Sequence, residues 1–197
     1  MKSVIPTPNS KPPTPKRCHW CGNDDLYTKY HDEEWGKEVH DDKVLFEFLI
    51  LEAAQAGLSW ITILRKRENY RRLFADFDAE KVAAFTEDDI ERILLDPGII
   101  RNRLKVVAAV NNAKLFLGVQ KEFGSFDQYL YSFMPDGRPI KNEILDSRKA
   151  PATTQISDSI AKDMKKRGFK FFGSTICYAH MQATGMVNDH ALDCDFR

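Results

Sequence analysis

Apolar side chains recur at helical spacing in one segment after another, and this pattern constrains the fold more than any other feature of the sequence. The segment after Asp42 illustrates it, with apolar residues at Val44, Leu45, Phe48 and Leu51. Intervals of three and four residues place such side chains on one face of an α-helix. No segment alternates convincingly with the period of two that a half-buried strand requires, and no internal repeat is visible. The sequence therefore predicts an all-α fold.

Capping residues and helix breakers divide the chain into separate helices. Thr86 followed three residues later by Asp89 resembles a capping box, and the run Asp96, Pro97, Gly98 ends the helix that it begins. The predicted helices span residues 42–57, 59–74, 78–84, 86–96, 100–124, 125–133, 157–168 and 175–183. The last of these is apolar enough to be buried, with Gly185 just beyond it as a left-handed closing residue.

Length and composition favour a single domain. A chain of 197 residues with 43% hydrophobic content can build one core of ordinary size. Residues 1–16 contain five of the nine prolines and little that could be buried, so we expect a disordered tail followed by one helical domain over 17–197. Residues 134–151, with three prolines, are predicted to form a surface loop.

Charge and cysteine content narrow the class of protein. Lys plus Arg equals Asp plus Glu at 29 each, so a polyanionic partner would have to bind through local patches. No apolar run approaches the roughly 20 residues that cross a membrane, and the polar N-terminus does not resemble a secretory signal. We therefore expect a cytoplasmic protein, in which the four cysteines are free thiols or metal ligands.

The turn between the helices predicted over 86–96 and 100–124 is suited to meet a phosphate. Gly98 has no side chain, so backbone amides at the start of the second helix could reach a phosphate oxygen, with the helix dipole in support. The basic residues Arg101, Arg103 and Lys105 follow directly. Such contacts predict binding to DNA that is sensitive to salt and tolerant of sequence. The alternative is an ordinary corner between helices with solvated charges.

Cysteine and histidine residues stand near both ends of the predicted domain. Cys18, Cys21 and His31 lie near its start, and His190 and Cys194 lie near its end. Four such ligands can close a tetrahedral zinc site, which here would join the two ends. Two ligand sets fit the sequence equally well, because either His31 or Cys21 could complete the set formed by the other three residues. The remaining cysteine, Cys177, lies in an apolar helix and is predicted to be part of the core.

Aromatic residues surround one acidic residue in the segment 20–60. The aromatic set consists of Trp20, Tyr27, Tyr30, Trp35 and Trp60. Glu52 lies between Trp35 and Trp60 on a largely apolar helix, where a carboxylate is costly without a partner. A flat cationic base held among aromatic rings would be such a partner. The alternative is a Glu52 that is partly exposed or paired with an arginine.

Six separated motifs resemble one enzyme family, DNA-3-methyladenine glycosylase type I, a branch of the helix-hairpin-helix DNA glycosylases. The resemblance covers the chain from Arg17 to Cys194. The motifs occupy residues 30–36 (YHDEEWG), 55–62 (QAGLSWIT), 66–70 (KRENY), 98–101 (GIIR), 166–171 (KRGFKF) and 187–190 (VNDH). The resemblance implies the fold of this family, a helix-hairpin-helix domain whose N- and C-terminal segments are joined by a structural zinc ion.

The resemblance also implies residue roles. The zinc ligands would be Cys18, His31, His190 and Cys194, with Cys21 excluded. Glu52 would recognise the alkylated base, with Tyr30 as a hydrogen-bonding partner and Trp60 as the stacking surface. Tyr27, Trp20 and Trp35 would line the pocket. Leu58 would fill the gap that the extruded nucleotide leaves in the duplex. The DNA backbone would be held by the hairpin residues Gly98, Ile99, Ile100 and Arg101.

The implied activity is base-excision repair of double-stranded DNA by a monomeric enzyme. It would hydrolyse the N-glycosidic bond of 3-methyladenine, and of 3-methylguanine if the pocket admits it, without cutting the strand. The family lacks the aspartate that related glycosylases place beyond the hairpin, and residues 113–126 contain none here. Two other functions also fit these residues: a DNA-binding module without turnover, and a zinc-stabilised domain that binds proteins.

Overall fold

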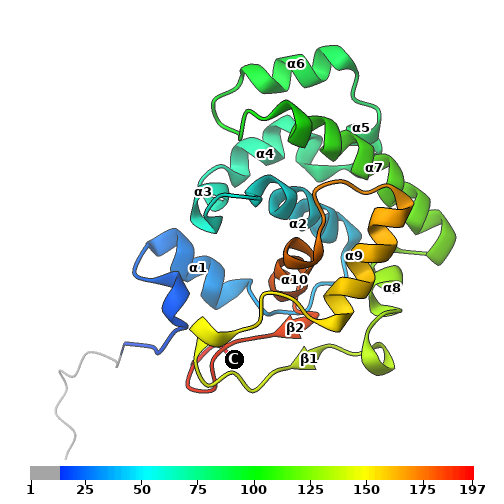
Figure 1. Ribbon diagram of the computed structural model, residues 1–197. Helices are drawn as coiled ribbons and strands as arrows, with labels where there is room; N and C mark the ends of the chain where they lie inside the picture. Colours follow the sequence, from blue (N-terminus) through cyan, green and yellow to red (C-terminus); the bar gives the residue numbers. More distant parts are fainter. Residues whose placement is uncertain (1–13) are drawn as a thin grey trace, which may run out of the picture.

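The computed structural model describes residues 14–197 as a single helical body (Figure 1). Its main helices are α1 (Asp25–Glu33), α2 (Asp42–Gln55), α3 (Trp60–Leu64), α4 (Arg67–Leu73), α5 (Ala79–Ala83), α6 (Glu87–Leu95), α7 (Arg103–Phe123), α8 (Phe126–Tyr131), α9 (Gln155–Arg167) and α10 (Ser174–Ala183). Short 3₁₀ turns lie at η1 (His19–Cys21), η2 (Ala75–Phe77), η3 (Pro135–Gly137) and η4 (Ser147–Lys149). Two short strands, β1 (Ile140–Lys141) and β2 (Val187–Asn188), complete the fold.

Helix α2 runs through the centre of the molecule. Every residue from Leu45 to Ala54 is buried, as expected for a helix that packs on all sides. Its start is capped by Asp41, whose carboxylate accepts from the backbone amide of Lys43 at 2.8 Å. At its end the Lys105 ammonium donates to the carbonyl oxygens of Ala54 and Ala56, at 2.7 and 2.8 Å. Both ends of the central helix are therefore held by side chains.

Most of the helix boundaries agree with the sequence patterns. The capping box of Thr86 and Asp89 is present at the start of α6, and the Ser125 hydroxyl caps α8. One predicted helix, over 59–74, is instead two, α3 and α4, separated at Arg65 and Lys66. Helix α9 begins two residues earlier than predicted, because Thr154 is its N-cap and Ser157 completes the capping box.

Helix α1 has no counterpart among the predicted helices. Its sequence is mostly polar, and only Tyr30 and His31 are buried along it. The Asp24 carboxylate caps its start by accepting from the amide of Tyr27 at 3.1 Å. With only two buried residues, α1 shows little apolar periodicity in the sequence. Its position in the fold depends on the contacts of Tyr30 and His31.

The expectation of an all-α fold is confirmed as a mostly helical one, with a small parallel ladder added. Ile140 pairs with Val187 and Lys141 with Asn188. Strands of two residues are too short to show an alternating pattern, so the sequence offered no sign of them. Strand β1 lies within the predicted surface loop 134–151, and its pairing with β2 fixes that loop to the C-terminal segment (Figure 1).

The two ends of the described chain lie side by side. The backbone amide of Lys16 donates to the Asp195 carboxylate at 2.8 Å, and the amide of Asp195 donates to the carbonyl of Lys16 at 3.0 Å. Residues 1–13 of the predicted tail lie outside the described part of the chain. Within residues 14–197, no helix combines the length and the apolar character needed to cross a bilayer.

Gly185 is expected to tolerate no side chain. Its φ is +70°, and a Cβ built on it would lie 2.2 Å from the carbonyl carbon of Lys37. Replacing it with alanine should lower the free energy of unfolding by about 3 kcal/mol or more, because backbone must move. Gly118 is the matched control, since it lies inside α7 with open space at its Cβ. Gly118→Ala should stabilise by about 0.5–1 kcal/mol. Urea unfolding of both variants measures the two effects, and similar values would contradict this account.

Candidate functional site

A cavity of about 180 Å³ opens between α1, α2, α3 and α10. All the aromatic residues that the sequence grouped around Glu52 contribute to its wall. The lining residues are Trp20, Tyr27, Tyr30, Trp35, Glu52, Gln55, Trp60, Ser147, Ala150, Ala179 and Gln182. The structure therefore brings the residues of the predicted base pocket together around one cavity.

The aromatic wall is built of rings in mutual contact. The Trp20 ring lies 5.0 Å from that of Tyr27 and 4.9 Å from that of Trp35, between centroids. Tyr30 and Trp60 approach to 5.5 Å. Phe48 lies almost parallel to Trp60 at 6.3 Å on the buried side of α2. Rings packed in this way are rigid, so they offer a preformed slot for a flat ligand.

Glu52 is the one buried acid in this slot. Its side chain is 3% exposed, and its Oε2 has no hydrogen-bond partner in the described part of the chain. Burial raises the pKa of the Glu52 carboxyl to about 8. A buried carboxylate without a partner attracts a cation strongly, and the faces of the surrounding aromatic rings attract positive charge as well.

Among residues 14–197, no arginine pairs with Glu52. The buried arginine Arg67 binds other acids: it donates to Glu47 at 2.5 Å and to Glu34 at 2.7 Å. Its guanidinium also lies over the ring of Phe48, 5.2 Å from the centroid. The alternative interpretation of Glu52, as a residue exposed or paired with arginine, is therefore wrong.

The indole nitrogens of Trp20 and Trp60 also lack partners. Both are buried N–H donors without an acceptor among residues 14–197. Buried polar atoms in folded proteins are nearly always paired, so unpaired ones require an explanation. Two unpaired donors and one unpaired carboxylate oxygen on residues lining the same cavity are typical of a site that binds a polar, flat molecule.

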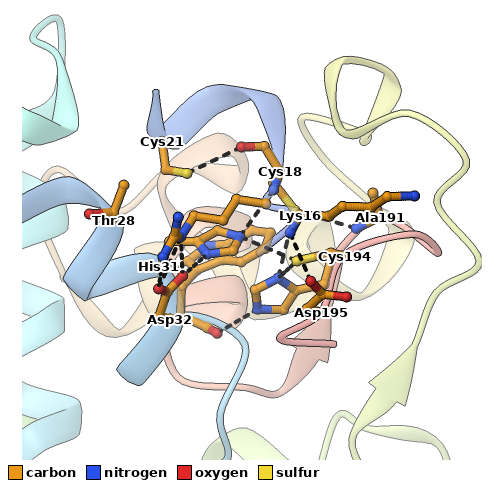
Figure 2. Close-up of polar contacts among 12 residues, drawn as sticks. Lys16, Cys18, Cys21, Thr28, His31, Asp32, Ala191, Cys194 and Asp195 are labelled. Carbon is orange, nitrogen blue, oxygen red and sulfur yellow. Dashed lines mark hydrogen bonds and ion pairs between the residues drawn. The ribbon is translucent and has the colours of Figure 1, made fainter. Parts of the chain in front are cut away.

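A second cluster lies next to the pocket and joins the two ends of the domain (Figure 2). Ligand atoms of Cys18, His31, His190 and Cys194 all lie within 4.8 Å of one another, and all four residues are buried. The Cys194 sulfur is 3.3 Å from Nδ1 of His190 and 3.6 Å from Nε2 of His31. The Cys18 sulfur is 3.6 Å from the same His190 nitrogen. These are residues that could hold one metal ion.

The two histidines of the cluster are each fixed by their second nitrogen. Nδ1 of His31 lies 2.7 Å from the Asp32 carboxylate, which in turn forms a two-point ion pair with Arg17. Nε2 of His190 lies 3.0 Å from the carbonyl oxygen of Trp35. Burial also lowers the pKa of His190 to about 4, which keeps its imidazole neutral. A neutral imidazole whose far N–H is bound presents a lone pair to the cluster.

The other two cysteines are not part of this cluster. Figure 2 shows the thiol of Cys21 directed to the carbonyl oxygen of Cys18, at 3.2 Å. The ligand set containing His31 is therefore the one that the structure brings together, and the set containing Cys21 is not. Cys177 is buried in α10, as predicted for a core residue.

The turn between α6 and α7 has the predicted tight form and is braced by α4. The Lys66 ammonium donates to the carbonyl of Pro97 at 2.8 Å, and the Tyr70 hydroxyl accepts from the amide of Ile100 at 3.2 Å. A Cβ on Gly98 would lie 2.6 Å from the Asn69 side chain. The amide of Gly98 donates to the Asp96 carboxylate at 2.7 Å, so this amide is already bound within the turn. Ile99 is buried beneath it.

The three basic residues after the turn differ in what they contact, which corrects the sequence-based picture. Arg103 pairs with Glu87 and Glu91 on α6. Lys105 is used at the end of α2. Only Arg101 is exposed with no ion pair among the described residues. Leu58, in the loop between α2 and α3, is 41% exposed, which leaves its side chain available.

Five lining residues were missed by the sequence analysis. Ala179 and Gln182 lie on α10, which was predicted to be a buried helix with no role in the site. Ser147 and Ala150 come from the loop predicted to lie on the surface, and Gln55 lies one turn beyond Glu52. The helical spacing of Gln55 after Glu52 was a usable signal, whereas the loop residues gave none. The Ser147 hydroxyl accepts from the amide of His19 at 3.1 Å, which holds the loop over the cavity.

Comparisons with known proteins agree with this geometry. The family model described as methyladenine glycosylase matches residues 20–197. The chain is 48% identical over 179 residues to DNA-3-methyladenine glycosylase 1 of Escherichia coli (strain K12), covering 91% of this chain and 95% of the relative. A crystal structure of 3-methyladenine DNA glycosylase I superposes with a TM-score of 0.88 at 49% identity, covering 91% and 98%. The Staphylococcus aureus enzyme, in a structure that addresses 3-methyladenine recognition, gives 0.87 at 37%, covering 91% and 95%.

Removing the charge of Glu52 should stabilise the protein. The folded-state pKa of about 8 exceeds the ordinary value of 4.5, so the unfolded chain loses the proton first and wild type loses stability as pH rises between these values. Glu52→Gln should therefore change little near pH 5 and raise the free energy of unfolding by about 3 kcal/mol near pH 8. Urea unfolding at both pH values measures the difference. A stabilisation that is equal at the two pH values would contradict this origin.

Proposed function

The chain belongs to the methyladenine glycosylase family, and from this premise we propose that it removes 3-methyladenine from double-stranded DNA by hydrolysing the bond between base and sugar. The observation that carries the proposal is the buried, unpaired carboxylate of Glu52 in a slot lined with aromatic rings. Methylation at N3 gives adenine a positive charge. The methylated base is therefore a flat cation of the kind that this slot is suited to bind.

The pocket accounts for selection of the base. Drawing a base out of the duplex costs a few kcal/mol, and stacking on Trp60 is worth about 1–3 kcal/mol per base. The charge of Glu52 adds attraction that neutral adenine does not receive. Tyr30, beside Trp60, offers a hydroxyl to the bound base, while Tyr27, Trp20 and Trp35 enclose it.

Selection and rate have different origins in this scheme. A cationic purine is already a good leaving group, so little acid catalysis is required. Glu52 attracts the cation before the bond breaks, and an interaction already present in the ground state does not accelerate the chemical step. We therefore assign Glu52 to recognition of the damaged base. No lysine is among the residues that line the cavity, which favours hydrolysis without strand cleavage.

The hairpin between α6 and α7 is the proposed DNA backbone site. Gly98, Ile99 and Ile100 form the turn, in which the amides of Gly98 and Ile100 are already bound to Asp96 and Tyr70, so a phosphate would be held by the remaining amides of the turn and by the dipole of α7. Arg101 supplies an exposed positive charge beside it. Leu58 is the proposed plug for the gap in the duplex, because it is an exposed apolar side chain in the loop that leads to Trp60.

We further propose that Cys18, His31, His190 and Cys194 bind one structural zinc ion. Tetrahedral zinc at 2.3 Å from sulfur and about 2.05 Å from nitrogen separates the two ligand atoms by about 3.6 Å. The sulfur–nitrogen distances of 3.3–3.6 Å fit this requirement. When bound, the ion would join the N- and C-terminal segments and take no part in the reaction. A monomer acting in the cytoplasm completes the proposal, and free cysteines suit a reducing compartment.

Excision by the wild type should depend on the ionisation of Glu52. Because a cationic base is attracted to the carboxylate and not to the carboxylic acid, kcat/KM for 3-methyladenine should rise about tenfold per pH unit and level off above pH 8. Glu52→Gln should lower kcat/KM by about 100-fold near pH 8 and remove the pH dependence. Mass spectrometry of bases released from methylated duplex DNA measures both. Release by the variant equal to that of the wild type would remove Glu52 from the proposal.

Zinc content should distinguish the cluster from neighbouring thiols. Elemental analysis of purified protein should find about one zinc per chain, and Cys194→Ser should lose most of it, because three ligands hold zinc weakly. Cys21→Ser is the matched control, since this buried thiol lies beside the cluster without belonging to it. The first variant should also melt at a lower temperature than the control. Equal zinc content in both variants would contradict the ligand assignment.

A further inference from the structure

A buried carboxylate behind the pocket is saturated with hydrogen-bond donors. Asp189 is fully buried, between β2 and the cluster residue His190. It accepts from the Tyr178 hydroxyl at 2.7 Å, from the Asn142 amide at 2.7 Å and from the Gln182 amide at 2.8 Å. Two donors from α10 and one from the segment after β1 meet on this one side chain.

Asp189 determines which end of the Gln182 amide faces the cavity. An ionised carboxylate has no proton to donate, so it accepts only from the nitrogen end of an amide. With Nε2 of Gln182 held by Asp189, the oxygen Oε1 is the end left for another partner. Gln182 lines the cavity, and no described residue donates a hydrogen bond to its Oε1. The pocket therefore contains a neutral acceptor of fixed orientation in addition to Glu52.

The backbone of Gln182 is fixed as well. Its carbonyl oxygen accepts from the amide of Gly36 at 2.9 Å, next to the pocket residue Trp35. A glutamine held at both its backbone and its side-chain nitrogen loses most of its rotational freedom before any ligand arrives. An acceptor that is fixed in advance discriminates between ligands better than one that can rotate to suit each of them.

We propose that Gln182 reads the group at position 6 of the purine, accepting a hydrogen bond from the 6-amino group of 3-methyladenine and disfavouring the 6-oxo group of 3-methylguanine. This inference rests on the proposed function. Both methylated purines are cations, so the attraction of Glu52 and the aromatic rings for positive charge does not by itself distinguish them. At position 6 adenine carries a donor and guanine an acceptor. An acceptor that cannot turn round pairs with the first and repels the second.

The test compares two bases released from the same DNA by the same enzyme. Gln182→Met keeps the length of the side chain and removes the acceptor. The ratio of 3-methyladenine to 3-methylguanine released per unit time should fall about tenfold relative to the wild type. Loss of folded protein lowers both rates equally, so a purely structural defect leaves the ratio unchanged.

Two further variants act as controls. Tyr178→Phe removes another donor to Asp189 without touching the cavity wall, and its ratio should stay within about twofold of the wild type. Gln182→Glu places two carboxyl groups 2.8 Å apart, where they share a proton and leave an acceptor oxygen for the base. This variant should keep the preference for 3-methyladenine.

The outcomes separate this inference from the proposed function. The role of Gln182 would be overturned if the ratio of 3-methyladenine to 3-methylguanine released by Gln182→Met stayed within twofold of the wild type. It would also be overturned if Tyr178→Phe lowered this ratio as much as Gln182→Met does. Neither result would contradict excision itself. A wild type that releases neither base would overturn the proposed function itself. A fall confined to Gln182→Met, with the preference kept by Gln182→Glu, would support the inference.

Discussion

The buried carboxyl group of Glu52, whose Oε2 has no hydrogen-bond partner among the described residues, requires rigid surroundings. A carboxyl group with 3% exposure and no partner costs stability, and only surroundings that cannot relax keep it so. Those surroundings are α2, which is buried on all sides, and a wall of aromatic rings in contact with one another. Desolvation of Glu52 lowers the stability of the folded protein. The same desolvation strengthens the attraction of its carboxylate for a cation, so the residue that lowers stability is the one proposed to recognise the base.

The Cys/His cluster and the pocket share one short helix with only two buried residues. On α1, Tyr30 lines the pocket while the next residue, His31, belongs to the cluster. Trp35 lines the pocket through its ring and binds His190 through its carbonyl oxygen. Helix α1 buries too little apolar surface to be held by packing alone. Tying it to the C-terminal segment through His31 therefore fixes the aromatic wall, which gives a structural cluster a direct effect on the shape of the pocket.

The sequence predicted those features whose physical cause is local or whose residues are chemically distinctive. Periodicity and caps gave α2, α6, α7 and α10, and the residue types of the pocket and cluster gave their members. It missed α1, because only two buried residues mark it, and the ladder of β1 and β2, because two residues cannot alternate. Gln182 was missed for a different reason: its function depends on Asp189, a partner that only the fold brings next to it.

Helix α4 and the residue before it, Lys66, connect the proposed DNA backbone site to the proposed base pocket. Lys66, just before α4, and Arg67 and Tyr70 within it make contacts in different directions. Lys66 and Tyr70 hold the hairpin through Pro97 and Ile100. Arg67, between them, binds Glu34 just after α1 and Glu47 on α2, the two helices that carry Tyr30 and Glu52. The ion pairs of Arg67 are buried, so they cost desolvation and contribute geometry more than stability. In the proposed function, a phosphate bound at the hairpin would thereby be held at a fixed distance from the slot that receives the base.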